Sequence, residues 1–348
     1  MEKLKAILET FGITEGGVAL QAIGHGLIND TYSVSYEGQA RYILQRINQQ
    51  VFLRTEALTN NIELLLPLLQ DPEYGSFRLY PDREGNRFPR INGEIWRLME
   101  YLPDSTVHQT TSDPRIAFEA GKVLRIFHRL LAGFDTGLLQ LTLSRFHDVH
   151  FRMEQFRTAR EGARASRLVV AEEQIRFVDQ FSEEFTGVDL SQLPVRACHN
   201  DTKLNNFLFT SEGKGLCLID LDTLMPGSIL FDLGDAIRTV ANPAKEDEAN
   251  LERIGLDLNM FASFIRGFGA EPGLLTAKEK ELVPWSAAYM PFLHGLRALT
   301  DYLENDRYYK VSYPEQNLDR CKSLLKFAGL ALENRSQMRA VINAEIPG

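Results

Sequence analysis

Three polar residues at fixed spacing, set between short apolar segments, constrain the fold of this chain more than any other feature. Asp201 is followed five residues later by Asn206, and fourteen residues after that comes Asp220. Residues 195–198 favour a short strand before this loop. Two more short strands fit between Asn206 and Asp220, joined by a turn at residues 211–215. The loop and the later acid therefore bracket one hairpin, and we expect them to lie close together.

This set of groups fits phosphoryl transfer from ATP. One carboxylate must accept or orient the proton of the attacking hydroxyl, and oxygen ligands must hold Mg²⁺ against the phosphates. The spacing of Asp201 and Asn206 equals that of the acid and the amide in the catalytic loop of protein kinases. We expect Asp201 to be catalytic, Lys203 to reach the γ-phosphate, and Asn206 and Asp220 to bind Mg²⁺. Asp222 is either a further metal ligand or a structural acceptor.

The same residues, together with blocks elsewhere in the chain, resemble a known family. The matching segments are residues 28–29, 31–32, 42–45, 199–206, 219–223, 225–228, 231–232, 234–235, 301–304 and 313–315. They resemble the aminoglycoside phosphotransferase and choline kinase superfamily. Within it, residues 202–206 and the C-terminal blocks are most similar to the N-acetylhexosamine 1-kinases, which phosphorylate the anomeric hydroxyl of a sugar. The resemblance implies an α+β fold of the protein-kinase type, with two lobes.

The order of the expected elements agrees with such a fold. Strands are expected around residues 19–23, 31–36, 41–47, 87–91 and 94–101, with helices at 2–11 and 54–69. Later helices are expected from Asp113-Pro114 onward, within 151–185, at 233–240 with Asp232 as its cap, and at 247–268, 276–301 and 318–342. We therefore predict a small antiparallel-sheet, nucleotide-binding lobe over residues 1–101. A larger, mainly helical lobe over residues 102–348 would carry catalysis and bind the substrate.

Two parts of the N-terminal lobe are candidates for binding ATP. Gly24 and Gly26 lie between two expected strands, where glycine lets backbone N–H groups approach phosphates. A simple hairpin turn explains the same two glycines, and the family resemblance favours the phosphate role. For adenine, our candidates are the backbone groups of Glu100, Tyr101 and Leu102, at the connection between the lobes.

The expected strand at residues 41–47 departs from the general kinase pattern. Gln45 stands where the phosphate-binding lysine of kinases is expected, and the side chain of the adjacent Arg46 points to the other face of the strand. The usual lysine–glutamate ion pair is therefore in doubt, with Glu63 as the candidate acid. The N-acetylhexosamine kinases resemble this chain in having glutamine here. Phosphate charge would then rest on Mg²⁺, Lys203 and backbone amides.

The residues that would bind the acceptor follow from the resemblance. Arg297 and Asp301 lie four residues apart and share a helix face, with Tyr302 next to them. By resemblance this block lines a sugar pocket. A surface Arg–Asp pair is the plain alternative. Asn205 either faces the sugar or braces the loop, and Asp201 lies within reach of the acceptor hydroxyl.

Composition excludes several classes of protein. The 348 residues carry a formal net charge of −9, which disfavours binding to nucleic acid. The three cysteines are scattered, without the spacing of a zinc site or a disulfide framework. No apolar run approaches the length of a membrane span. We expect a cytoplasmic protein with small-molecule partners, a sugar and ATP, whose oligomeric state the sequence leaves open.

The sequence therefore favours an ATP- and Mg²⁺-dependent kinase of N-acetylglucosamine or N-acetylgalactosamine. Choline, homoserine or an aminoglycoside are alternative acceptors for the same chemistry. A kinase-like binding protein without catalytic activity is a further alternative, for which Gln45 is the only support.

Overall fold

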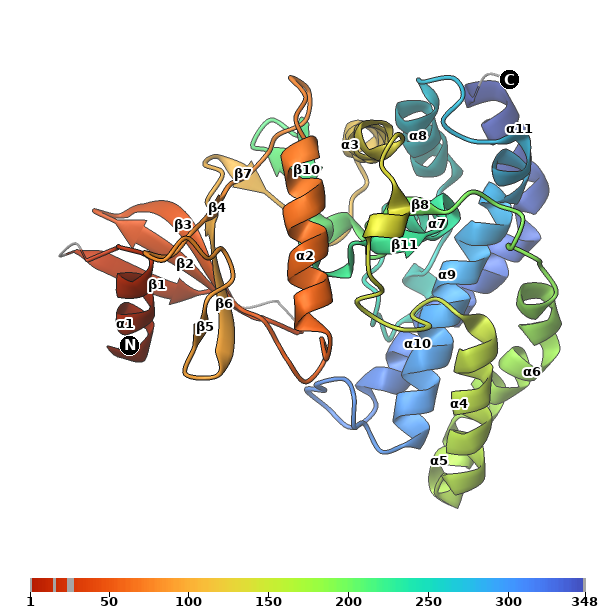
Figure 1. Ribbon diagram of the computed structural model, residues 1–348. Helices are drawn as coiled ribbons and strands as arrows, with labels where there is room; N and C mark the ends of the chain where they lie inside the picture. The colour runs from red at the N-terminus through yellow and green to blue at the C-terminus, as the bar shows by residue number, and fades with distance from the viewer. Residues whose placement is uncertain (1, 15–16, 24–27, 347–348) are drawn as a thin grey trace.

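The structure, a computed structural model, describes residues 2–14, 17–23 and 28–346. Figure 1 shows an antiparallel sheet at one side, a larger helical part at the other, and helix α2 (Thr55–Leu65) standing between them. The predicted α+β fold is confirmed. The division of the chain at residues 101 and 102 remains a prediction.

The sheet forms the N-terminal part. Its strands are β1 (Val18–Ala22), β2 (Asp30–Tyr36), β3 (Gln39–Arg46), β6 (Glu94–Glu100) and β4 (Leu79–Tyr80), in that spatial order, with β5 (Arg90–Ile91) paired to β6. All of these pairs are antiparallel. Helix α1 (Glu2–Thr10) covers one face, where its Ile7 and Leu8 are buried with Leu44, Trp96 and Leu98. The other face is left for contact with the rest of the molecule.

The larger part is built mainly from helices. These are α3 (Pro114–Leu131), α4 (Val149–Gly162), α5 (Ala165–Val170), α6 (Glu172–Thr186), α7 (Ile229–Val240), α8 (Leu258–Gly269), α9 (Ala277–Leu303), α10 (Gln316–Glu333) and α11 (Arg335–Glu345). Short strands accompany them: β7 (Ser105–Thr106), β8 (Arg196–Cys198), β9 (Phe207–Thr210), β10 (Gly215–Leu218) and β11 (Met225–Gly227). Single 3₁₀ turns are η1 (Leu66–Leu68), η2 (Thr136–Leu138), η3 (Leu204–Asn206), η4 (Leu221–Thr223) and η5 (Leu251–Arg253).

Helix α2 joins the two parts. Its buried residues Leu58, Ile62 and Leu65 belong to the large core of the helical part, not to the cluster under α1. The fully buried Asn61 donates from Nδ2 to the carbonyl oxygens of Leu224, at 2.8 Å, and of Gln140, at 2.7 Å. The helix therefore holds the segment after Asp220 in place by packing and by hydrogen bonds.

Two pairs of helices in the helical part pack with their backbones in close contact. Helix α7 lies against α9, and a Cβ added at Gly234 would come within 2.2 Å of the carbonyl oxygen of Ser286. Helices α3 and α8 approach in the same way at Gly121, where an added Cβ would lie 2.1 Å from the carbonyl oxygen of Phe264. Glycine at these two positions allows backbone contact that any side chain would prevent.

The expected helix boundaries are partly correct. Asp113 caps α3, with Pro114 in its first turn, as predicted. The expected start of α7 is wrong: the helix begins at Ile229, capped by Ser228, and Asp232 lies inside its first turns. The expected helix over residues 247–268 is also too long. Its first part is loop and η5, and Asp257 caps α8. In both cases a nearer polar residue caps the helix.

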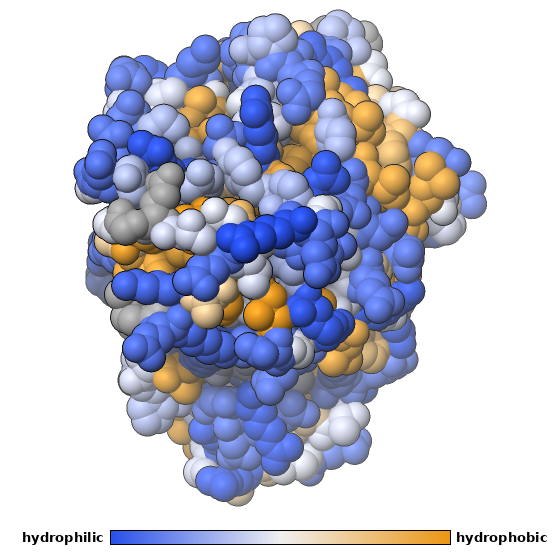
Figure 2. Space-filling model, turned by 60° about the vertical axis from the view of Figure 1, so that its left-hand side comes forward, coloured by the Kyte–Doolittle hydropathy of each residue, from blue (hydrophilic) through white to orange (hydrophobic). Residues whose placement is uncertain are grey.

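Surface and core agree with the composition. Figure 2 shows a face that is mostly hydrophilic, with scattered hydrophobic areas. Within the described ranges, no helix is both long and apolar enough to cross a membrane. Cys198, Cys217 and Cys321 are buried free thiols.

Candidate active site

The predicted catalytic loop lies between β8 and β9, and β10 ends just before Asp220. This arrangement brings Asp201, Asn206 and Asp220 together as expected. Asn200 and Asp220 adopt left-handed backbone conformations, with φ of 64° and 62°. Asparagine and aspartate tolerate this region better than other residues with a Cβ. Pairing of β11 with β8 closes the segment after Asp220 back onto the start of the loop.

The buried Asp232 of α7 supports the loop between β8 and β9 by hydrogen bonds to its backbone. Its carboxylate accepts the backbone N–H groups of His199, at 2.9 Å, and of Asn200, at 2.6 Å. His128 Nε2 lies 3.0 Å from the same carboxylate. Thr202 Oγ1 donates to the backbone oxygen of Asp232 at 2.5 Å. Asp232 therefore supports the loop and does not cap the helix as predicted.

Asp201 is held by two side chains of its own loop. Lys203 Nζ lies 2.9 Å from Asp201 Oδ2, and Asn206 Nδ2 donates to the same oxygen at 2.9 Å. Burial alone would lower the pKa of Lys203, but the charges of Asp201 and Asp220 outweigh it and raise this pKa above the ordinary value. Lys203 therefore stays a cation beside the Asp201 carboxylate, where a phosphate would be attracted.

Asn206 and Asp220 present free oxygen atoms. Both hydrogen bonds of the Asn206 side chain use Nδ2, to the backbone oxygen and to Oδ2 of Asp201, so Oδ1 remains available. The Asp220 carboxylate has neither a hydrogen bond nor an ion pair with any described residue. Loss of hydration around the carboxylate, and then the charge of Asp222, raise the pKa of Asp220 to about 6. A carboxylate and an amide oxygen without protein partners fit a Mg²⁺ site.

Asp222 makes protein contacts with both of its oxygens. Arg97 Nη1 lies 2.5 Å from Oδ1, and Asn29 Nδ2 donates to Oδ2 at 2.6 Å. Asp222 is almost fully buried. Of the two roles expected for it, these contacts correspond to the structural acceptor, and its role as a metal ligand remains a prediction.

The expected lysine position is part of the same buried network. Gln45 Oε1 accepts from Arg97 Nε at 2.8 Å and also from Nη2, while Gln45 Nε2 donates to Thr31 Oγ1 at 2.8 Å. Glu63, the candidate acid, is exposed and lies 3.9 Å from Arg87, so it does not pair at this site. The sequence analysis missed Arg97. Its signal was a charged residue between Trp96 and Leu98, inside the otherwise apolar residues 95–99.

The candidates for adenine lie at the end of β6. The backbone N–H of Glu100 donates to Arg78 at 2.9 Å and that of Tyr101 donates to Arg41 at 3.0 Å, so both are occupied. The N–H of Leu102 has no partner among the described residues, which leaves it as the available donor of the three. Gly24 and Gly26 lie outside the described residues, and their phosphate role remains a prediction.

Two of the residues expected to bind the substrate, Arg297 and Asn205, make no ion pair with described residues. Arg297 lies against two aromatic rings, with Cζ 5.0 Å from the ring centre of Phe146 and 5.9 Å from that of Tyr308. Burial would lower the pKa of Arg297, but Tyr309, Tyr308 and Asp201 raise it, so this guanidinium lies within electrostatic reach of Asp201. Asn205 is half-buried and has no hydrogen bond to described residues, so its amide is free for a ligand.

Asp301 and Tyr302 contact protein instead. The Asp301 carboxylate accepts the backbone N–H groups of Tyr308, at 2.7 Å, and Tyr309, at 3.0 Å, and the side chain of Asn317 at 2.8 Å. The alternative of a surface Arg297–Asp301 pair is therefore wrong, since Asp301 is buried and is used to fold the loop after α9. The Tyr302 ring is buried beneath Arg167, whose Cζ lies 4.3 Å from the ring centre. Direct sugar contact by either residue remains a prediction.

Further charged residues lie around Glu246, whose charge acts on Lys203. Arg238 of α7 pairs with Asp235 at 2.7 Å and with Glu246 at 2.6 Å, and Arg320 of α10 lies 3.3 Å from Glu246. Arg152 of α4 is part-buried, and burial followed by the charge of Arg297 lowers its pKa to about 10. Arg152 and Arg320 are distant in sequence from residues 235–246, so no local pattern could have grouped them with Glu246.

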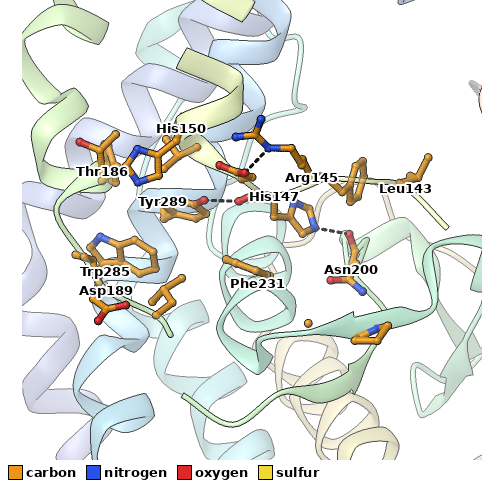
Figure 3. A pocket seen from close by; sticks show the side chains of 18 of the residues that line it. Leu143, Arg145, His147, His150, Thr186, Asp189, Asn200, Phe231, Trp285 and Tyr289 are labelled. Atoms are coloured by element: carbon orange, nitrogen blue, oxygen red, sulfur yellow. Dashed lines mark hydrogen bonds and ion pairs between the residues drawn. The ribbon is translucent and has the colours of Figure 1, made fainter. Parts of the chain in front are cut away.

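A separate pocket lies behind the catalytic loop. It has a volume of about 560 Å³, and aromatic side chains such as Trp285, Tyr289 and Phe231 line it. Figure 3 shows His147 beside it, bonded to the backbone oxygen of Asn200 at 3.0 Å. None of the predicted catalytic or metal residues lines this pocket, so it is distinct from the site around Asp201.

The fold and the residue set together define a phosphotransferase. The model of the phosphotransferase enzyme family matches residues 19–263, which include Asp201, Asn206 and Asp220. The chain therefore belongs to the phosphotransferase enzyme family, and the predicted aminoglycoside phosphotransferase and choline kinase superfamily is confirmed. The closer likeness to N-acetylhexosamine kinases remains a prediction.

Solved structures show the same fold over nearly the whole chain. A microcompartment-associated aminopropanol kinase is 16% identical with a TM-score of 0.66, over 97% of this chain and 98% of that one. Spectinomycin phosphotransferase in complex with ADP and spectinomycin is 15% identical with a TM-score of 0.65, over 95% and 98%. Choline kinase from Streptococcus pneumoniae is 14% identical with a TM-score of 0.58, over 94% and 99%.

Proposed function

We propose that this phosphotransferase uses Mg²⁺ and ATP to phosphorylate the anomeric hydroxyl of an N-acetylhexosamine, giving the sugar 1-phosphate. The observation that carries the phosphotransfer step is that Asp201 is bound by Lys203 and Asn206, with Asp220 near enough to act electrostatically on Lys203. The solved structure of a phosphotransferase of this fold with ADP supports the choice of nucleotide. The sequence likeness to N-acetylhexosamine kinases supports the choice of acceptor.

The chain's own residues have distinct tasks in this proposal. Asp201 accepts a hydrogen bond from the attacking hydroxyl and orients it, while Lys203 and Asn206 hold the carboxylate in place. Lys203 also attracts the phosphoryl group, because it remains charged. Asn206 and Asp220 would hold Mg²⁺, which neutralises phosphate charge as it develops in the transition state.

Charges on the acceptor side favour a neutral acceptor over a cation. Arg152 and Arg297 have no carboxylate within ion-pair distance among the described residues, and Arg297 acts electrostatically on Asp201. A quaternary ammonium or an aminoglycoside would be repelled by these guanidinium groups, because both are positively charged. Such cationic ligands need an acidic or aromatic cage instead. Sugar hydroxyl and acetamide oxygens can accept hydrogen bonds from arginine at no such cost.

The same arginines define a second candidate. Homoserine carries a carboxylate that two unpaired guanidinium groups could bind in a bidentate manner. Its ammonium group would then need an acid nearby, and Glu246 already contacts both Arg238 and Arg320. A sugar therefore remains the first choice.

Release of ADP from Mg·ATP tests the proposal with a panel of acceptors. The panel contains N-acetylglucosamine, N-acetylgalactosamine, glucose, galactose, choline, homoserine and kanamycin, and ³¹P NMR identifies the product. A sugar 1-phosphate is the expected result. Turnover only with choline, homoserine or kanamycin would contradict the acceptor but keep the kinase chemistry. Nucleotide binding without turnover on any acceptor would instead support the binding-protein alternative.

A further inference from the structure

A buried arginine lies between the sheet and the segment that carries the second acid. Arg97 is 2% exposed, and its side chain leaves the face of β6 opposite to the one that Trp96 and Leu98 turn toward α1. It reaches Asp222, two residues beyond Asp220, at 2.5 Å. One guanidinium group therefore ties the sheet to the proposed metal-binding segment.

The strand register places this arginine beside the expected lysine position. Gln45 of β3 and Arg97 of β6 are directly paired across two antiparallel strands. Directly opposed residues point to the same face of a sheet. The Arg97 side chain therefore leaves the sheet on the face, and at the level, where a lysine at position 45 would leave it.

Gln45 is held as an acceptor for this cation. Its Nε2 is bound to Thr31 Oγ1 at 2.8 Å, which fixes the amide so that Oε1 faces the Arg97 guanidinium. A lysine at position 45 would instead place two cations against each other. The positive charge that kinases with the lysine carry on β3 is therefore carried on β6 in this chain, and Gln45 accepts hydrogen bonds from it.

We propose that Arg97 replaces the phosphate-binding lysine of kinases as the fixed positive charge of the nucleotide site, with Gln45 as its positioning residue and Asp222 as its acidic partner. Arginine has five N–H donors, and the contacts with Gln45 and Asp222 use three. The other two donors have no partner among the described residues and would bind phosphate oxygens. The inference rests on the proposed use of a nucleotide and is independent of the acceptor.

Calorimetric titration with Mg·AMP-PNP, without any acceptor, tests this proposal. Arg97→Met should weaken binding by at least about 30-fold, and Arg97→Lys by less, because lysine keeps the charge. Gln45→Ala should also weaken binding, since it frees the guanidinium. In the exchange variant Gln45→Lys/Arg97→Gln the charge returns to β3, and its affinity should exceed that of Arg97→Met.

Arg46→Met is the matched control. Arg46 is the next residue on β3 and also pairs with carboxylates, Asp30 and Glu94, but it does not contact Asp222. Its loss should leave the affinity for Mg·AMP-PNP within about twofold of wild type. Melting temperatures of all variants separate lost stability from lost affinity.

The outcomes are distinguishable. Wild-type affinity in folded Arg97→Lys and Gln45→Ala, or a loss confined to melting temperature, would overturn the role of Arg97 while leaving the proposed kinase intact. Should Arg97→Met fail to fold, those two variants and the exchange variant still decide the question. Failure of the wild-type protein to bind Mg·AMP-PNP would overturn the proposed nucleotide, and this inference with it.

Discussion

At the scale of single residues, the site contains one carboxylate that other side chains hold in place and one without a partner among the described residues. Asp201 is bound by Lys203 and Asn206, both of its own loop, which fixes its orientation. The exposed Asp220 carboxylate has no hydrogen bond or ion pair with any described residue. Two acids of the same type therefore receive different roles from their surroundings, and each role can be tested by one substitution.

Asp201→Asn should lower turnover by about 10²- to 10⁴-fold, because the amide can no longer accept the proton of the hydroxyl. Binding of Mg·AMP-PNP should change little, since the proposed metal ligands remain. Steady-state kinetics with the active acceptor, together with calorimetry, measure both quantities. Equal turnover in the variant and the wild type would remove Asp201 from the mechanism.

Asp220→Ala should instead weaken the binding of Mg·AMP-PNP. Loss of a direct metal ligand should cost at least the roughly 10- to 100-fold that loss of an outer partner of a metal site costs. Titrations at several Mg²⁺ concentrations check this expectation. An unchanged Mg²⁺ dependence would show that the metal is held elsewhere.

At the scale of elements, helix α7 supports the catalytic loop through Asp232. Two backbone N–H groups of the loop end on this one buried carboxylate, and nothing else in the described structure accepts them. Their loss would leave buried donors without acceptors, which is costly. Stability and activity should therefore respond together at this position.

Asp232→Ala should lower the free energy of unfolding by about 3 kcal/mol or more, since each charge-assisted hydrogen bond contributes roughly 1.5–3 kcal/mol. Urea unfolding measures the change. Asp257→Ala, which removes the cap of α8, is the control and should cost about 1 kcal/mol with no loss of turnover. A similarly small cost at Asp232 would argue against the bracing role.

At the scale of the whole molecule, buried ion pairs join distant segments and make stability sensitive to acid. Glu246 lies between Arg238 of α7 and Arg320 of α10. Burial alone would raise the pKa of Glu246, but the two arginines lower it from 4.5 to about 2. Since the unfolded chain binds this proton more readily, the stabilisation is complete above about pH 4.5 and is lost as the pH falls toward 2.

Wild-type protein should therefore be more stable than Glu246→Gln at pH 7, and this difference should shrink between pH 4.5 and pH 3. Urea unfolding at pH 7, 4.5 and 3 measures it. Glu56→Gln, on the exposed side of α2, is the control and should differ little from wild type at each pH. A difference that stays constant with pH would show that Glu246 contributes through packing and not through charge.

The sequence by itself determined the elements whose causes are local. The grouping of Asp201, Asn206 and Asp220 was visible because these residues lie at the two ends of one hairpin, and Asp113-Pro114 marked the start of α3 by its own capping chemistry. Gln45 was visible as a departure from the kinase pattern because the local sequence of the expected strand showed it.

Only the tertiary structure decided which residue lies beside Gln45, where kinases have a lysine. Arg97 meets Gln45 through strand pairing and meets Asp222 through contact between the sheet and the helical part, 52 and 125 residues away in sequence. Asp301 folds a loop and does not pair with Arg297, because backbone N–H groups of the loop reach it first. Local patterns fix which groups a chain offers, whereas packing between distant segments fixes which of these groups meet.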